Sequence, residues 1–516
     1  MTYERKSVMQ LDGVWNDTML WYAKAVREMM RRPITNPTSW RFQAAMHGFD
    51  RASWEDAGYL EPDEKLPHQT HWNQCQHQTW YFLPWHRGYI AAFEAIVRDA
   101  IVKLGGPTDW ALPYWNYSDD DNDFTRMLPQ CFSERTLPDG APNPLWVERR
   151  YGEYTVEGRI VLRRDLVNLQ ALDDAMFTSP RGKESVLSGF GGPCSKFRHS
   201  RRGWSGGLEN KPHNGVHNAI GGTNPANNHI AGLMSSPITA ALDPVFWIHH
   251  ANIDRLWQVW LDMKDRGHHN PEDDNWLYGP PQKSDHKTFV MYQPDGSHYL
   301  FAPHDMVDLA SPRLDYTYQK SHDPIPPDRL QRRSKQLRVR ASQLESTQAN
   351  AAASVELLGA SQTELQLSGQ SHQATVRIDP PSHAKMAQSY LALEQVSGQA
   401  LTQDEPDRAF LRLDGIRTRR SDVLLRVFLE HPVDGSHLQV GVFSLFGANA
   451  AAHDAADHDD DGVSEVFEIT DAIDQWHLDG HADLAELRVH IESNRPLSAA
   501  EDVRIEHIRL YRLGGN

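Results

Sequence analysis

The chain has 516 residues, enough for two to four domains and for at least one large hydrophobic core. Its 52 Lys and Arg residues are outnumbered by 69 Asp and Glu residues, which gives a formal charge of −17 at pH 7. Because this charge repels phosphate groups, we expect no nucleic acid partner and no anionic membrane surface.

The N-terminal segment, MTYERKSVMQ, contains no uninterrupted apolar region of the kind found at the centre of a signal peptide. No later run approaches the roughly 18 apolar residues that a membrane-spanning helix needs. We therefore expect a soluble, cytoplasmic protein. The sequence does not fix the oligomeric state, and a homo-oligomer is compatible with it.

The first part of the chain has the periodicity of amphipathic helices. The predicted helices cover residues 14–32, 40–47, 84–103, 212–220 and 244–264. Residues 118–210 are rich in Pro, Gly and charge, so we expect a long irregular insertion there, with one strand-like run at 154–162. Of the 16 tryptophans only Trp476 follows residue 276, which indicates that a different kind of domain comes later.

Histidine is unusually frequent, with 27 residues against 17 Phe, which indicates metal binding or a response to pH. A first set lies in the N-terminal quarter. His47 ends a predicted helix, His86 lies in the first turn of another, and His77 lies in the loop before it. His68 and His71 also precede His77 and are alternatives to His47.

A second set begins with His213 and His217, which are four residues apart. On a helix they lie one above the other and can offer two imidazoles to one ion. Downstream, Asp243 can cap a helix that carries His249 and His250. Since His249 shares its helix face with apolar residues, we predict that His250 is the third ligand. His249 is then either a packed histidine or one that contacts the ligands without binding the ion.

The two sets lack the carboxylates of other metal enzymes. Neither matches HExxH, and no Glu-x-x-His pair accompanies them, so a zinc protease or a di-iron carboxylate bundle is disfavoured. Six imidazoles without a carboxylate suit copper, with zinc and nickel as alternatives. The remaining interpretation is a chance gathering of histidines in a His-rich chain.

After residue 320 the pattern changes. Residues 321–335 are Pro-rich and basic and predict an extended linker. Beyond them, alternating or β-branched runs separated by turn residues predict an antiparallel β-sandwich. These runs cover residues 336–341, 375–378, 423–429, 438–446, 487–491 and 503–513, and the acidic segment 453–461 is best explained as a solvated loop.

Two segments resemble the copper signatures of the type-3 copper proteins, the family of tyrosinases, catechol oxidases and molluscan haemocyanins. They are FLPWHRGYIAAFE around His86 and DPVFWIHHANIDRLW around His250. The sequence Tyr316-Thr317-Tyr318 is similar to the motif that closes the catalytic domain in plant members. The resemblance implies two copper ions, one bound by His47, His77 and His86 and the other by His213, His217 and His250.

The resemblance also implies the fold, an α+β multidomain protein. A mainly α-helical catalytic domain with a four-helix-bundle dicopper core would occupy residues 1–320, and a C-terminal antiparallel β-sandwich would occupy residues 336–516 after the 321–335 linker. The segments 440–447, 466–473 and 487–491 look like the sandwich of molluscan haemocyanin units, which covers the copper site. Phe443, Leu445 and Phe446 are candidates for a side chain that plugs the site, and core residues are the alternative.

Further site residues follow from the same resemblance. Cys75-Gln76-His77 looks like the Cys-x-His pair in which a thioether joins the cysteine to the histidine ring, an ordinary thiol being the alternative. Glu209 resembles the glutamate that holds a water as general base, with Asn214 helping to hold it; the alternative for Glu209 is a carboxylate at a helix N-terminus. The side chains expected to line the substrate pocket are Asn218, Met234 and Ser236.

The implied activity is that of a tyrosinase, a copper-dependent phenol oxidase. With O2 it would hydroxylate monophenols to o-diphenols and oxidise o-diphenols to o-quinones, while the C-terminal domain shields the site. Its partners would then be phenolic small molecules and O2. Two alternatives stay open: a catechol oxidase without monophenolase activity, and an O2-binding protein like haemocyanin.

Overall fold

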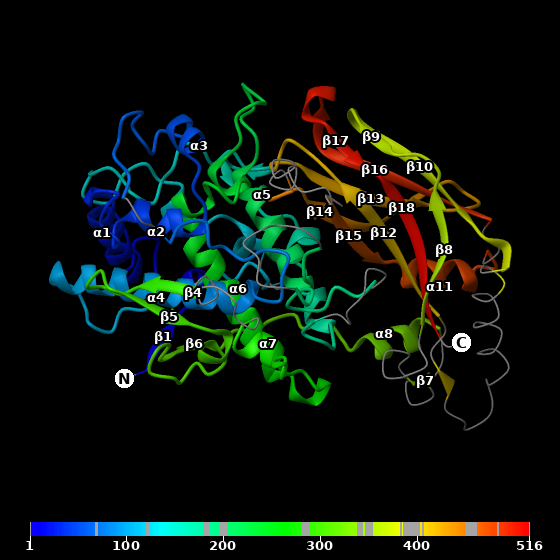
Figure 1. Ribbon diagram of the computed structural model, residues 1–516, viewed down its shortest axis with the longest axis horizontal. Helices are drawn as coiled ribbons and strands as arrows, with labels where there is room; N and C mark the ends of the chain where they lie inside the picture. Colours follow the sequence, from blue (N-terminus) through cyan, green and yellow to red (C-terminus); the bar gives the residue numbers. More distant parts are fainter. Residues whose placement is uncertain are drawn as a thin grey trace. The chain divides into compact units, whose positions relative to one another are not determined.

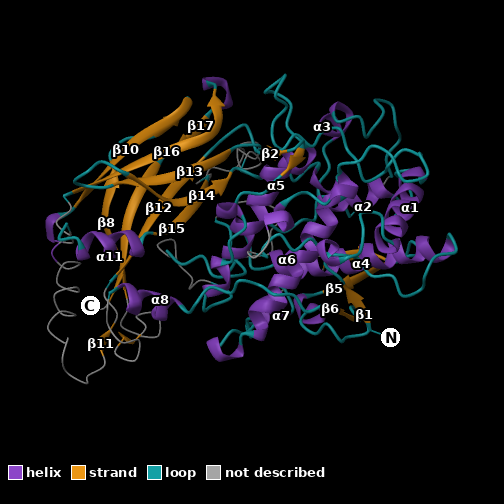
Figure 2. Ribbon diagram, turned by 180° about the vertical axis from the view of Figure 1, so that it is seen from behind, coloured by secondary structure: helices purple, strands orange, loops and turns teal. Residues whose placement is uncertain are grey.

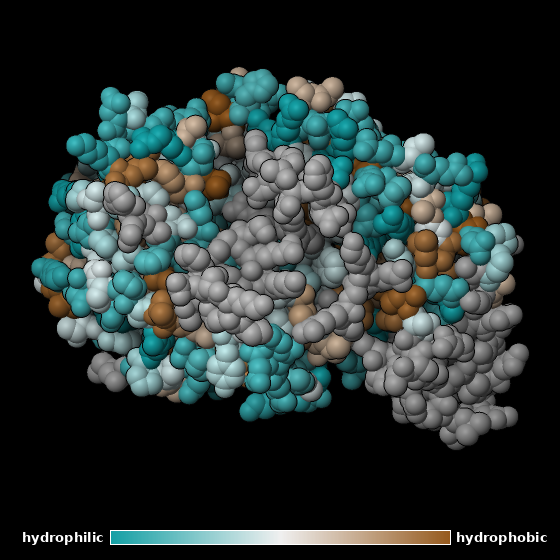
Figure 3. Space-filling model, viewed as in Figure 1, coloured by the Kyte–Doolittle hydropathy of each residue, from teal (hydrophilic) through white to brown (hydrophobic). Residues whose placement is uncertain are grey.

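The computed structural model describes residues 2–67, 71–119, 123–178, 186–195, 204–279, 289–337, 344–345, 354–381, 384, 403–404, 407–448, 462–481 and 485–514. The chain divides into two compact units. Unit 1 comprises residues 1–178, 189–201 and 206–324, and unit 2 comprises residues 179–188, 202–205 and 325–516. No helix within the described ranges is long and apolar enough to cross a membrane, and the face drawn in Figure 3 is largely hydrophilic.

Unit 1 is mainly helical (Figures 1 and 2). Its α-helices are α1 (Asp17–Arg31), α2 (Trp40–His47), α3 (Arg51–Asp56), α4 (Phe82–Lys103), α5 (Gly215–Gly221), α6 (Val245–Asp262) and α7 (Asp274–Leu277). Side chains at the N-termini satisfy free backbone groups, as Asn16 accepts from the Met19 N–H and Ser39 from the Phe42 N–H. The helices predicted at 14–32, 40–47, 84–103 and 244–264 are thereby confirmed with small changes at their ends.

The predicted helix at 212–220 differs from the observed one. A π-helical turn, η6 (Glu209–Asn214), precedes α5, and Lys211 inside it has extended backbone angles. Helical structure therefore begins at Glu209, three residues earlier than predicted. This matters for the site because η6 and α5 carry a glutamate and two histidines of the predicted set.

The described part of the predicted insertion consists of short 3-10 turns and one small hairpin, β2 (Thr155–Val156) with β3 (Arg159–Ile160). A second hairpin of unit 1 pairs β4 (Phe289–Tyr292) with β5 (His298–Phe301). The few regular hydrogen-bonded elements agree with the expectation of irregular structure over 118–210.

The two ends of unit 1 meet in a parallel strand pair, β1 (Tyr3–Arg5) with β6 (Tyr316–Tyr318). Beneath it lies a buried charge network. Arg5 donates to Glu94 at 2.8 Å and to Asp254 on α6 at 3.2 Å, and Arg87 on α4 also pairs with Asp254. The hydroxyls of both strand tyrosines donate to the same carboxylate. Burial raises the pKa of Asp254, but the guanidinium groups outweigh it and the pKa lies below its usual value.

Unit 2 is built on an eight-stranded antiparallel sheet in the order β14-β13-β16-β10-β8-β18-β12-β15. The strands are β8 (Ser354–Ser361), β10 (Gly369–Ile378), β12 (Arg408–Ile416), β13 (Leu424–Glu430), β14 (His437–Ser444), β15 (Val463–Glu468), β16 (Glu486–Leu497) and β18 (His507–Gly514). The edge strands β14 and β15 approach each other, with the Phe443 and Phe467 rings 5.8 Å apart. One curved sheet therefore encloses the core.

Shorter elements complete unit 2. They are α8 (Arg329–Gln336), β7 (Leu344–Glu345), β9 (Leu365–Leu367), β11 (Gln403–Asp404), α11 (Thr470–Leu478) and β17 (Val503–Ile505). The predicted run at 503–513 is two strands, because β17 pairs with β9 whereas β18 joins the large sheet. Within the predicted 321–335 linker, residues 329–336 are helical rather than extended, since Asp328 caps the helix and Arg333 pairs with the buried Asp474.

Two of the three candidate plug residues belong to the hydrophobic core of unit 2. Phe443 and Leu445 are buried in its hydrophobic cluster with Trp476 of α11, and Phe446 beside them is also buried. The acidic segment 453–461 lies outside the described residues. A smaller cluster joins Val186, from the predicted insertion, to Phe410 of β12, so that segment belongs to unit 2.

Candidate metal centre

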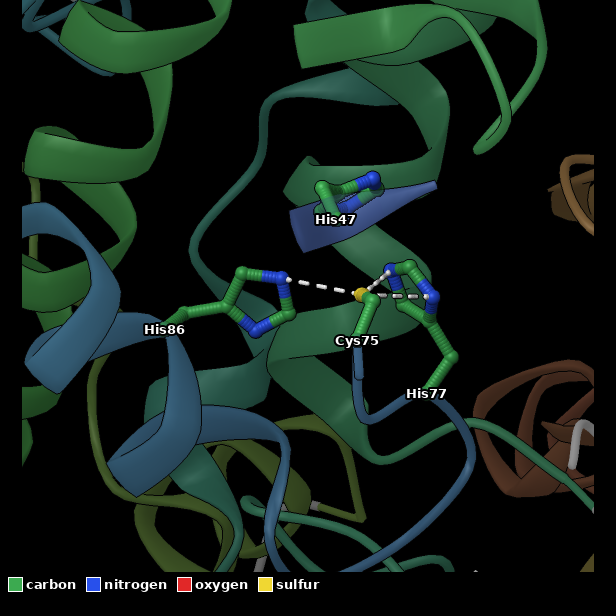
Figure 4. Close-up of side chains that lie close together, drawn as sticks. All are labelled: His47, Cys75, His77 and His86. Carbon is green, nitrogen blue, oxygen red and sulfur yellow. Dashed lines mark hydrogen bonds between the residues drawn. The ribbon is translucent and has the colours of Figure 1, made fainter. Parts of the chain in front are cut away.

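The first histidine set comes together in the interior of unit 1. His47 lies at the end of α2, His86 lies one turn into α4, and Cys75 and His77 come from the loop before α4 (Figure 4). The four side chains are buried, and one possible ligand atom from each lies within 4.8 Å of the others. This is the set of three histidines predicted from the sequence, with one sulfur among them.

The second set lies in the same interior. His213 comes from η6, His217 from α5, and His249 and His250 from the second turn of α6. All four are buried, and their possible ligand atoms also lie within 4.8 Å of one another. Within this set the Nε2 atoms of His217 and His250 are 3.4 Å apart.

The two sets face each other. The rings of His86 and His250 stack with their centroids 4.5 Å apart, and those of His77 and His213 are 5.5 Å apart. Imidazoles that belong to different sets are thus as close as imidazoles within a set. The arrangement is a single buried cluster with room for two neighbouring ions.

Hydrogen bonds fix which ring nitrogen of each histidine could bind a metal. The Nδ1 atoms of His47, His86 and His217 lie 2.8, 2.7 and 2.9 Å from the carbonyl oxygens of Pro237, Phe82 and Met234. Since a carbonyl only accepts, Nδ1 carries the proton in each ring and Nε2 presents its lone pair. Such partners orient metal-binding histidines and fix their tautomer.

Electrostatics keep these rings uncharged. Burial lowers the pKa of His213 to about 3, and burial together with neighbouring histidines places the pKa values of His86, His217 and His250 well below their usual range. Neutral imidazole is the form that binds a metal. Six imidazoles without a carboxylate ligand suit copper, so the residues fit a dinuclear copper site.

Both histidines of the His249-His250 pair lie in the cluster. His249 holds the Tyr117 hydroxyl at 3.0 Å through Nδ1, and its ring stacks on His213 at 5.5 Å. His250 lies between the two sets, against His86 and His217. The prediction for His249 was a packed histidine or one that contacts the ligands without binding the ion, and its neighbours are Tyr117, His213 and His217.

Cys75 lies against two histidines of its set. Its sulfur is 3.3 Å from Nδ1 and 3.7 Å from Nε2 of His77, and 3.5 Å from Nε2 of His86 (Figure 4). The sulfur therefore lies close to both nitrogens of the His77 ring. The other cysteines, Cys131 and Cys194, are not members of either group of possible ligands.

Glu209 and Asn214 both touch the histidine cluster. The buried Glu209 carboxylate accepts the Gln78 backbone N–H at 2.8 and 2.9 Å, next to His77 in the chain. Asn214 places Oδ1 2.8 Å from Nδ1 of His213. The carboxylate of η6 is therefore linked to the first set, and the amide to the second.

The predicted pocket residues take different positions. Asn218 is buried on α5, one residue after His217. Met234 is fully buried and contacts His217 through its carbonyl, and the partly exposed Ser236 accepts the Ile238 N–H at 3.3 Å. Of the alternatives to His47, His71 pairs with the Tyr292 hydroxyl at 2.8 Å and lies in neither set, while His68 lies outside the described residues.

Sequence reasoning missed the role of the segment 234–237. Its backbone carbonyls at Met234 and Pro237 hold one histidine of each set. Since any residue supplies a carbonyl, no side-chain pattern could indicate this. A partial signal is Gly48, where an added Cβ would lie 2.3 Å from the Pro237 oxygen, so the close approach requires glycine.

Two family models match the chain. Residues 37–263 match the common central domain of tyrosinase, and residues 354–513 match a domain of unknown function, DUF7868. The first match contains all the histidines of both sets. The second covers most of unit 2.

Similar proteins are tyrosinases and polyphenol oxidases. Tyrosinase HcTyr1 from Hahella sp. (strain CCB-MM4) is 41% identical over 286 residues, 53% of this chain and 56% of that protein. Polyphenol oxidase A1, chloroplastic, from Vicia faba is 28% identical over 324 residues, 60% of this chain and 46% of that protein. The chain thus spans about half the length of these relatives.

Solved structures share the fold over nearly the whole chain. Latent apple tyrosinase aligns with 99% of this chain and 97% of its own length, with a TM-score of 0.56 and 21% identity. Recombinantly expressed latent aurone synthase, a polyphenol oxidase, aligns with 100% of this chain and 90% of its own, with a TM-score of 0.57 and 18% identity. The helical unit followed by an antiparallel sheet unit is therefore a known combination.

Proposed function

Because the chain belongs to the tyrosinase family of type-3 copper proteins, we propose that it is a tyrosinase. It would use O2 to hydroxylate monophenols to o-diphenols and to oxidise o-diphenols to o-quinones. The observation that carries this proposal is the close approach of the two histidine sets, with His86 stacked on His250 at 4.5 Å. A pair of copper ions held there supplies, when bound, the two-electron chemistry with O2 that both reactions need.

The chain's own residues would hold the two copper ions and keep bulk water away from them. His47, His77 and His86 would hold one ion, and His213, His217 and His250 the other. We assign the last place to His250 rather than His249, since His250 lies between the sets, where its ring stacks on His86. Burial of the whole cluster keeps the imidazoles neutral and ready to bind.

Monophenol hydroxylation needs a base, because a free phenol has a pKa near 10 and stays protonated at neutral pH. Glu209 would act as this base through a water that it holds together with Asn214. Two features support the assignment: Glu209 is buried beside the His77 loop, and Asn214 contacts His213. A carboxylate that accepts a water proton raises the basicity of that water.

The substrate would be a phenolic small molecule that enters beside the second set, where Asn218, Met234 and Ser236 would line its path. The support is their position: Asn218 follows His217, and Met234 contacts it. We also assign a thioether between Cys75 and His77. The support is the closeness of the sulfur to both ring nitrogens, at 3.3 and 3.7 Å, and such a bond would hold the imidazole in one orientation.

Unit 2 would shield the site and keep the enzyme inactive until it is released. Support comes from the fold, which matches a latent tyrosinase over 99% of this chain. The test compares the full chain with a chain that ends at Pro324, using a monophenol and an o-diphenol as substrates. We expect low turnover by the full chain and faster turnover of both by the shortened one.

The same measurement separates the alternatives. Turnover of the o-diphenol alone would make the protein a catechol oxidase. A copper-loaded chain that binds O2 reversibly and oxidises neither phenol would be an oxygen carrier. Either outcome would refute the tyrosinase proposal and leave the copper site intact.

Substitution of Glu209 tests the proposed base. Glu209→Gln keeps an oxygen that can accept the Gln78 N–H, so the local structure should persist. We expect monophenol hydroxylation to fall about 100-fold, as for loss of a general base. Oxidation of o-diphenols, which needs no deprotonation of this kind, should fall much less, and an equal loss of both activities would contradict the assignment.

A further inference from the structure

A third group of possible metal ligands lies in unit 2, in a part of the molecule that the proposed function does not use. Glu430 ends β13, His437 begins β14, and His490 lies in β16, and these strands are neighbours in the sheet (Figure 1). One possible ligand atom from each of the three side chains lies within 4.8 Å of the others.

The sheet register brings the three side chains to one face. Glu430 is opposite His437, and Phe428 is opposite His490. Residues alternate between faces along a strand, and Val427 and Leu429 point into the buried core. Phe428 and Glu430 therefore point outward. Glu430 is the diagonal neighbour of His490, a position from which long side chains meet.

The contacts resemble a site whose ligands are already in place. His490 Nε2 is 2.7 Å from a Glu430 oxygen, and the rings of His437 and His490 are 3.9 Å apart and 32° from parallel. Two imidazoles held this close repel each other when both are protonated, whereas neutral rings can share a cation. The other Glu430 oxygen accepts from Arg488 at 2.8 Å, which orients the carboxylate.

We propose that Glu430, His437 and His490 bind a single divalent transition-metal ion, with Cu²⁺ preferred. Two imidazoles and a carboxylate form a donor set that takes Cu²⁺, Ni²⁺ or Zn²⁺, and among these the affinity order favours Cu²⁺. Ligand atoms around such an ion are about 3 Å apart, because the bonds are about 2.0–2.2 Å long. The Glu430 oxygen and His490 Nε2 thus need to separate by only a few tenths of an ångström, and the ion would replace the proton that Nε2 donates to the carboxylate.

The ion would join the hairpin of β13 and β14 to β16, which comes much later in the chain. His437 is exposed on β14 and can turn toward the pair formed by Glu430 and His490. Arg488 can keep its hydrogen bond to one carboxylate oxygen while the other binds the ion. The open coordination positions would be filled by water. Because the ion binds only the folded sheet, it should raise the thermal midpoint of unit 2.

The test is a titration of Cu²⁺ into the full chain already loaded with two copper ions per molecule. We expect one further equivalent to bind, and an electron paramagnetic resonance signal of an isolated Cu²⁺ coupled to two nitrogens. In His437→Ala, where the lost side chain is exposed, affinity should fall at least tenfold and one nitrogen coupling should vanish. Glu430→Gln should weaken binding as well while it keeps a similar shape.

His507→Ala is the matched control. His507 lies in β18 of the same unit beside Glu506, with Nε2 3.7 Å from the carboxylate, but outside the group of three. The His507→Ala chain should bind the extra ion with the same affinity as the unchanged chain. An extra ion that His437→Ala and Glu430→Gln retain at full affinity, or one that His507→Ala loses equally, would overturn the proposal.

Discussion

Gly48 shows how one residue can control the orientation of a proposed metal ligand, His47, through a third residue. It follows His47, and its backbone is extended, so alanine could adopt the same angles. An alanine Cβ would nevertheless lie 2.3 Å from the Pro237 carbonyl oxygen, which accepts from His47. Because the clash involves backbone atoms, the chain around Pro237 must move to relieve it.

We therefore expect Gly48→Ala to lower the copper content from two ions per chain toward one, because His47 loses its orienting partner. Metal analysis of the purified variant measures this. Gly58→Ala is the control: it has open space around the new Cβ but a left-handed backbone, so it should cost about 1 kcal/mol of stability and keep both ions. Full copper content in Gly48→Ala would contradict the argument.

Asp254 is the shared acceptor of the buried network under β1 and β6. Asp254→Asn leaves Arg87 buried without its carboxylate, while Arg5 keeps Glu94, and a broken buried pair costs about 3–5 kcal/mol. We expect a clearly lower midpoint of thermal unfolding. Asp56→Asn, which breaks an exposed pair with Arg149, should change stability by about 1 kcal/mol or less. Similar effects of the two substitutions would argue against the network.

At the scale of elements, the start of α6 sets the position of the histidine pair that this helix carries. Asp243 accepts the Val245 N–H at 3.0 Å and forms a buried ion pair with Arg150. His249 and His250 follow in the next turn. The contacts of Asp243 therefore set the direction of α6, and this direction decides whether His250 reaches the other histidines.

Two substitutions of Asp243 separate the hydrogen bond from the charge. Asp243→Asn can still accept the backbone N–H but loses the ion pair, and Asp243→Ala loses both. We expect both to lower the free energy of unfolding by about 3–5 kcal/mol, with about 1 kcal/mol more for alanine. Denaturant titration measures the difference. Asp262→Ala, an exposed change near the other end of α6, should stay within about 0.5 kcal/mol.

The elements that the sequence predicted well are those with a local cause. The helices at 40–47 and 244–264 have apolar periodicity and appear nearly as predicted. Ser39 caps the first, and Asp243, just before the second, accepts the Val245 N–H. The helix at 212–220 failed at its start, since a π-helical turn with an extended Lys211 has no periodicity of its own. The residues 503–513 formed two strands because pairing partners far away in the sequence, such as β9, decide where a strand breaks.

The same distinction applies to the site. His213 and His217 were predictable from spacing, and the remaining histidines from their helices and the family motifs. The carbonyls of Met234 and Pro237, and the Tyr117 contact of His249, depend on chain segments brought together only by the fold. Their residue types carry no signal for these roles.

At the scale of the molecule, the buried histidines make the metal-free chain sensitive to acid. The pKa values of His86, His217, His249 and His250 are lowered well below the ordinary 6.5, and that of His213 to about 3. Above pH 6.5 the folded and unfolded chains both keep these rings neutral. Below it, the unfolded chain takes up protons that the folded chain cannot, so stability falls as the pH falls.

We expect the thermal midpoint of the metal-free chain to drop steeply between pH 6.5 and pH 4. Each such histidine can contribute about 1.4 kcal/mol per pH unit in this range. Differential scanning calorimetry at several pH values measures the slope, and the copper-loaded chain serves as the comparison because bound metal opposes protonation. A midpoint that stays constant or rises on acidification would show that the rings are protonated in the folded state.

The pairing of β1 with β6 has a consequence for how the protein can be rearranged. Tyr3 lies opposite Tyr316, so the polypeptide enters and leaves unit 1 at one spot on its surface. A short peptide could join these two points, and new termini could be opened in a surface turn such as the one at Gly140, yielding a circular permutant. The same geometry would allow the unit to be inserted as a cassette into a loop of an unrelated protein.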